Sequence, residues 1–103
     1  MFAREANTKP KAIVREVAMS LVKIEVFSSQ FGGHVVVGRN GKLDTTLRAK
    51  VALAFRKERL DADAIVKGSG HKVEILVRDG AVIGMPSHLE DRPKLVEELS
   101  AIF

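Results

Sequence analysis

The chain has 103 residues, 46% of them hydrophobic and 29% charged, which is the ordinary composition of one globular domain and not that of a disordered tail. It contains no cysteine, and this excludes disulfide scaffolds, thiolate metal sites and cysteine nucleophiles. The formal net charge of +4 is uneven, at +7 in residues 1–60 and −3 in residues 61–103, and such an asymmetry attracts polyanions.

We expect no targeting segment in the amino-terminal residues. Residues 1–5 lack the continuous apolar stretch of a signal peptide. No apolar run in the chain approaches the roughly 20 residues that a membrane helix needs. We therefore expect a cytoplasmic protein with no membrane partner.

Residues 8–43 predict a helix followed by two strands. A helix is expected from about Pro10 to Ser20, where apolar residues recur at helical spacing. The period changes to two at Val22–Val26, which predicts a half-buried strand, and His34–Val37 predicts a second strand. A turn signature at Gly38–Gly41 follows.

Asp44 is a good N-cap for the next helix, which is apolar on one side and basic elsewhere. The apolar stripe consists of Leu47, Val51, Ala54 and Phe55, and the cations are Arg48, Lys50, Arg56, Lys57 and Arg59. Because the stripe must face a sheet, the basic residues are expected to face water or a ligand.

Three strands are expected after Leu60. Ala64–Val66 is a short candidate, and Val73–Val77 alternates with polar residues over a longer stretch. Asp79 and Gly80 then supply a tight hairpin turn into Ala81–Ile83.

The last helix is expected to begin at Asp91 rather than Ser87, because Pro93 then lies in its first turn. Its buried face is expected to consist of Leu95, Val96, Leu99, Ile102 and Phe103. The predicted fold is therefore one α+β domain, in which residues 44–103 form a helix, a three-stranded antiparallel sheet and a helix. Residues 1–43 are expected to extend this core with a helix and a hairpin. This order is similar to double-stranded-RNA-binding-like folds.

The candidate nucleic-acid contacts are the basic residues of the middle helix and of two neighbouring loops. They are Arg39, Lys42, Arg48, Lys50, Arg56, Lys57, Lys67 and Lys72. The chain has five Phe and no Tyr or Trp, which disfavours recognition by base stacking. Contacts to phosphate and ribose of duplex or structured RNA are therefore expected.

His71 lies in a flexible basic loop, Lys67–Lys72, that precedes a strand. A histidine there can exchange a proton with a ribose hydroxyl, because its reference pKa is near neutrality. The alternative is an ordinary hairpin connection whose glycines serve only the backbone. His34 is expected at a strand rim and His88 at a helix start. No pair of histidines has metal-ligand spacing, so neither a metal nor a cofactor is expected.

One family resemblance rests on short motifs. Lys67-Gly68-Ser69-Gly70-His71, then Asp79-Gly80, then Met85-Pro86-Ser87-His88 and a closing helix resemble HicA-type mRNA interferase toxins. That family has a Gly-Ser-His loop, a hairpin and a Pro-x-His before its second helix. The resemblance implies that His71 is catalytic, that His88 is the Pro-x-His residue, and that an antitoxin-like protein is a partner.

A second resemblance uses another part of the chain. Val36-Val37-Gly38-Arg39-Asn40, followed by Leu43-Asp44 and Leu47-Arg48, is similar to the opening strand and helix of ribosome hibernation-promoting factors. This resemblance implies no chemistry, with basic helix faces that bind ribosomal RNA.

RNA binding is thus the expected function, and RNA cleavage by His71 is its sharper form. One alternative is a non-catalytic ribosome-associated factor. Another is a protein-interaction module, such as a homodimer, that pairs through an exposed strand at Val22–Phe27.

Overall fold

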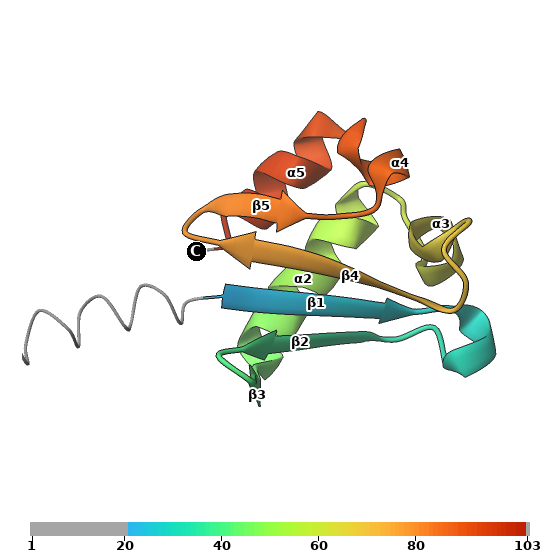
Figure 1. Ribbon diagram of the computed structural model, residues 1–103, viewed down its shortest axis with the longest axis horizontal. Coiled ribbons are helices and arrows are strands. Elements are labelled where there is room, and N and C mark those ends of the chain that lie inside the picture. Colours follow the sequence, from blue (N-terminus) through green and yellow to red (C-terminus); the bar gives the residue numbers. More distant parts are fainter. Residues whose placement is uncertain (1–20, 103) are drawn as a thin grey trace, which may run out of the picture.

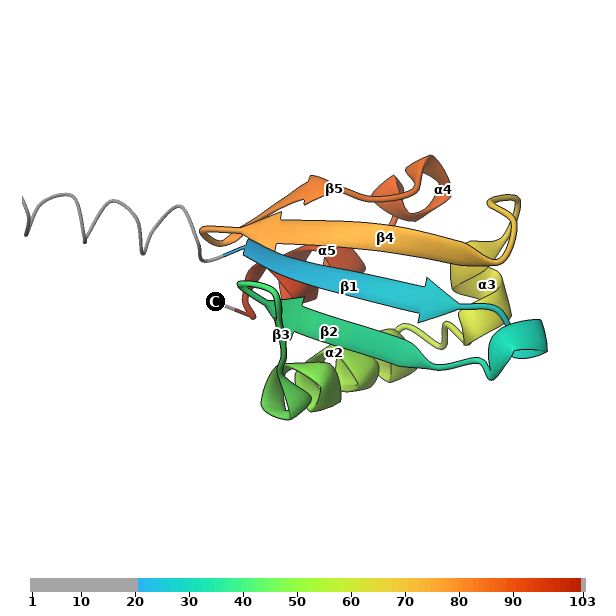
Figure 2. The same ribbon diagram turned by 60° about the horizontal axis from the view of Figure 1, so that its bottom comes forward.

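Five strands form one antiparallel sheet in the order β3-β2-β1-β4-β5. The computed structural model describes residues 21–102, and the helix expected at residues 10–20 lies outside this range. The strands are β1 (Leu21–Phe27), β2 (Val35–Arg39), β3 (Lys42–Leu43), β4 (Lys72–Arg78) and β5 (Ala81–Gly84). The helices are η1 (Ser29–Phe31), α2 (Thr45–Lys57), α3 (Ala62–Val66), α4 (Ser87–Glu90) and α5 (Pro93–Ser100). In both views α2, α3 and α5 lie on the same side of the sheet (Figures 1 and 2).

Strand β1 is the centre of the sheet. It pairs with β2 on one side and β4 on the other, so that Ile24 lies opposite both Val37 and Ile75. Val22, Ile24 and Val26 have no exposed surface, because they point into the core between sheet and helices. The expectation of an exposed strand here is wrong, since both edges of β1 are already paired.

Helix α2 begins and packs as its sequence predicts. The Asp44 carboxylate accepts a hydrogen bond from the Leu47 amide at 3.0 Å, which is the geometry of an N-cap. The predicted apolar stripe is buried and consists of Leu47, Val51, Ala54 and Phe55. The stripe fixes the rotation of the helix and leaves its cations on the surface.

The segment after Leu60 is a helix, and the strand expected at Ala64–Val66 is a wrong prediction. The Asp61 carboxylate accepts a hydrogen bond from the Ala64 amide at 2.8 Å and caps α3. Ile65 and Val66 are both buried by this short helix, whereas a strand would have pointed them to opposite faces. The burial of both Ile65 and Val66 therefore outweighs their local preference for a strand, and the segment forms a helix.

The carboxy-terminal half contains the predicted hairpin and two helices. Asp79 and Gly80 both have positive φ (53° and 78°), as a two-residue turn between β4 and β5 requires. The final helix starts at Pro93 with Arg92 as its N-cap, and the residues from Ser87 form the separate helix α4. The N-cap of the final helix is therefore Arg92, one residue after the expected Asp91, and Pro93 lies in the first turn as expected.

The fold is α+β with a five-stranded antiparallel sheet, and the expected class is confirmed at that level. Residues 44–103 do not form the expected helix, three strands and helix, because they contain two strands of the main sheet. Residues 21–43 supply the other three strands, including the central one, and so they belong to the core.

Candidate nucleic-acid interface

The sequence-predicted cations separate into a group around α2 and a group at the opposite end of the sheet. Arg39 lies opposite Val22 at one end of β1, whereas Lys72 lies opposite Phe27 at the other end. The five-residue offset along β1 corresponds to about 17 Å of strand. The two basic loops therefore do not converge on one place.

The first group starts at the β2–β3 hairpin. Arg39 and Lys42 are direct cross-strand partners around a two-residue turn in which Asn40 and Gly41 have φ of 57° and 81°. Because side chains alternate along a strand, Arg39 shares the face of buried Val37, which α2 covers.

Helix α2 continues the basic surface from this hairpin. Its 13 residues include four cations and no acidic residue. Arg48 is on the flank beside β2, where its Nε donates to the Val35 carbonyl at 2.8 Å. Lys57 is on the flank beside α5, where it forms an ion pair with Glu98 at 3.7 Å. Lys50, two turns before Lys57, shares that flank.

The outer surface of α2 lies between these two flanks. Leu53 is 47% exposed there, and Arg56 is exposed one turn further on. Arg59, which follows the helix, is also exposed and was not among the predicted contacts, although three of the four residues 56–59 are basic, which is a usable signal. The helix therefore presents cations along both sides of an exposed strip.

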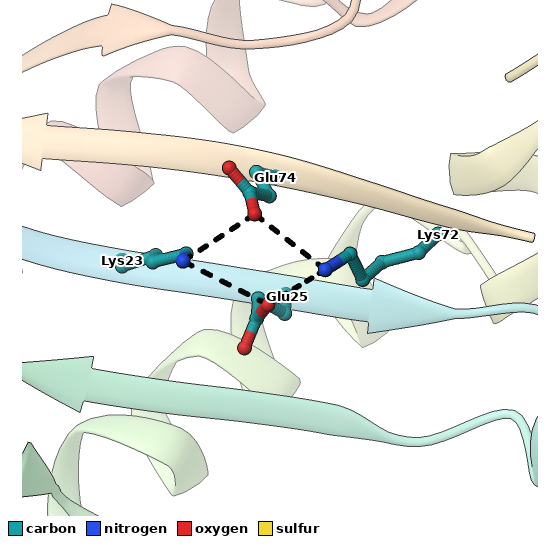
Figure 3. Close-up of polar contacts among 4 residues, drawn as sticks. All are labelled: Lys23, Glu25, Lys72 and Glu74. Carbon is teal, nitrogen blue, oxygen red and sulfur yellow. Dashed lines mark hydrogen bonds and ion pairs between the residues drawn. The ribbon is translucent and has the colours of Figure 1, made fainter.

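Lys72 belongs to a charge network on the opposite, helix-free face of the sheet (Figure 3). Its Nζ lies 3.1 Å from Glu25 and 3.6 Å from Glu74, and Lys23 approaches the same two carboxylates at 3.9 and 3.4 Å. Glu25 and Glu74 are direct cross-strand partners, so the lysines offset their repulsion. The hydrogen bond and charge of Glu25, followed by the charge of Glu74, raise the pKa of Lys72. The network balances its own charge and does not extend the basic surface of α2.

His71 lies beside Phe31 rather than beside a second proton-transfer group. The two rings meet edge to face with their centroids 4.7 Å apart, and the His71 carbonyl accepts a hydrogen bond from the Ser28 amide at 2.8 Å. His34 stacks on Phe27 at 4.6 Å. His88 Nε2 lies 3.2 Å from the Ala64 carbonyl, in a cavity that Lys67 also lines. The three histidines thus have separate partners.

Residues 21–102 contain no group of three or more His, Asp or Glu side chains placed to hold a metal ion. In the same range no helix has the length and apolar character needed to cross a membrane. Comparisons with protein-family models, with curated proteins and with solved structures found no match to this chain. Its function is therefore inferred from its own residues.

Proposed function

We propose that this protein binds RNA through the outer surface of α2 and the adjoining β2–β3 hairpin. The observation that carries the proposal is the concentration of exposed cations on a 13-residue helix without a single carboxylate. The proposed contact residues are Arg39, Lys42, Arg48, Lys50, Arg56 and Arg59.

The contacts are to phosphate and ribose rather than to base edges. Lys and Arg side chains on two flanks of a helix match the two lines of negative charge along a duplex backbone. The apolar side chain exposed between them is Leu53, which offers no hydrogen bond to a base edge. Structured or duplex RNA is thus favoured over single strands, and little sequence preference is expected.

Three of the sequence-predicted contacts are not part of this proposal. Lys57 is paired with Glu98, Lys72 is held by Glu25 and Glu74, and Lys67 lies at the far end of the sheet with His88.

A gel-shift comparison of two double variants with equal net charge tests the proposal. The first variant, Lys50→Ala with Arg56→Ala, removes two cations from α2. The control, Arg78→Ala with Lys94→Ala, removes two exposed cations from β4 and α5. For duplex RNA at low salt, we expect the first variant to bind about tenfold or more weakly, because a hydrogen bond to a charged group contributes about 1.5–3 kcal/mol net. The control should bind like the natural protein, and equal weakening by both variants would refute a localised site.

Cleavage is tested separately from binding. Within residues 21–102 the His71 ring contacts Phe31 and makes no hydrogen bond to a group that would tune it as a base. We expect total RNA to remain intact with the natural protein and with His71→Ala. RNA decay that disappears in the variant would instead support the interferase hypothesis.

A further inference from the structure

A cavity of about 460 Å³ lies between α3, α4 and the start of α5, away from the α2 surface. Its walls are apolar at Leu60, Ala64 and Leu89, and basic at Lys67, His88 and Arg92, with Gly68 completing the lining. The volume is within the range of about 300–1,000 Å³ that small-molecule sites occupy. Three basic groups from three successive segments therefore meet at one concave place.

The lining contains no carboxylate to balance this charge. Among the described residues, neither Lys67 nor Arg92 forms an ion pair, and both side chains are exposed. Glu90 and Asp91 are close in sequence, yet they do not line the cavity. The cavity thus differs from the network of Lys23 and Lys72, which supplies its own anions.

The backbone and one histidine contact set where the three residues lie. His88 Nε2 hydrogen-bonds to the Ala64 carbonyl at 3.2 Å, which ties α4 to α3 across the cavity. Lys67 is the residue that ends α3, and Gly68, with φ of 77°, turns the chain there. Arg92 is the N-cap residue of α5, and its guanidinium makes no cap hydrogen bond because it has no acceptor atom.

We propose that this cavity binds a phosphate monoester. A monoester is a dianion with three terminal oxygens, and the guanidinium of Arg92 and the ammonium of Lys67 supply two charges and several N–H donors. Leu60 and Leu89 provide apolar surface for the organic group that the phosphate carries. The monoester is either a free phosphorylated small molecule or the terminal phosphate of an RNA, and both present the same chemistry.

The test is an NMR titration of the full chain with inorganic phosphate and with adenosine 5′-monophosphate. We expect shifts of the His88 ring and the Gly68 amide, with tighter binding of the nucleotide. Lys67→Ala and Arg92→Ala should each weaken binding about tenfold or more. Lys94→Ala is the matched control, because Lys94 is an exposed cation of α5 that does not line the cavity. Unchanged amide spectra elsewhere would show that the variants are folded.

The source of the phosphate is distinguished with RNA. Tighter gel-shift binding of a 5′-phosphorylated oligomer than of its 5′-hydroxyl form, lost in Arg92→Ala, assigns the cavity to RNA ends, whereas equal binding assigns it to a small molecule. The Lys50→Ala, Arg56→Ala variant should keep its phosphate shifts, so this inference stands apart from the proposed RNA surface. The proposal is overturned if phosphate shifts neither group, if acetate binds as tightly, or if Lys94→Ala weakens binding equally.

Discussion

The Asp44 carboxylate sets the start of α2 and, with it, the position of every cation on that helix. It accepts the Leu47 amide hydrogen bond at 3.0 Å and leaves the first turn capped. Replacing an N-cap Asp by Ala costs about 1 kcal/mol of folding free energy. We expect Asp44→Ala to lower the unfolding free energy by about that amount in urea denaturation. Asp44→Asn should retain most of the stability, and equal losses in the two variants would argue against a capping role.

Asp63 connects two segments that are far apart in the sequence. Its carboxylate accepts a hydrogen bond from the Ser29 backbone amide at 2.9 Å, and this bond lowers the pKa of Asp63 from its ordinary value of 3.8. The contact joins α3 to the short helix η1, at the same end of the sheet as His71.

A lowered pKa in the folded state means that the ionised form of Asp63 stabilises the fold. The contribution is complete above pH 3.8 and is lost as the pH falls below that value through the folded-state pKa. We expect the stability of Asp63→Asn to fall less steeply with acid than that of the natural protein. Urea unfolding at a series of pH values measures this difference, and parallel curves below pH 4 would contradict it.

Whether a contact can be predicted from the sequence depends on how far apart in the chain its two residues lie. Asp44, the apolar stripe of α2 and the Asp79–Gly80 turn are specified by neighbours a few residues away, and each was predicted. The contacts of His71 with Phe31 and of Asp63 with Ser29 span dozens of residues, and no local pattern marks them.

At the scale of elements, the sheet depends on a strand that lies outside the predicted core. β1 separates β2 from β4 and buries three of its side chains completely. Alternation in the sequence revealed the strand itself. It did not reveal the neighbours of the strand, because pairing partners are chosen by the packing of the whole sheet.

This topology predicts that residues 44–103 cannot fold alone. Without β1, the buried face of β4 and the stripe of α2 lose the strand against which they pack. We expect a fragment of residues 44–103 to show no cooperative thermal transition by circular dichroism and narrow amide dispersion by NMR. A cooperative transition like that of the full chain would contradict the central role of β1.

The packing of the whole fold also explains why the strand predicted at Ala64–Val66 is the helix α3. Ala64, Ile65 and Val66 are apolar and the last two are β-branched, so local propensity favoured a short strand. In the fold Ile65 and Val66 must both be buried, and a capped helical turn achieves this.

In the molecule as a whole, the cations divide into three groups according to the part of the fold on which they lie. Those of α2 and the hairpin belong to the helix-covered side, Lys23 and Lys72 belong to the open face, and Lys67 joins His88 and Arg92 at the far end. The basic helix could be predicted from the sequence, because its residues are consecutive. The separation of the two basic loops could not, because the sheet order places them at opposite ends of β1.

The most direct test of the proposed RNA surface is the salt dependence of duplex RNA binding. Removing one cation that contacts a phosphate reduces the slope of log K against log salt by about 1, so the loss of two contacts reduces it by roughly 2. We expect this reduction for the Lys50→Ala, Arg56→Ala variant and no change for the Arg78→Ala, Lys94→Ala control. Equal slopes for the natural protein and both variants would show that α2 does not contact the RNA backbone.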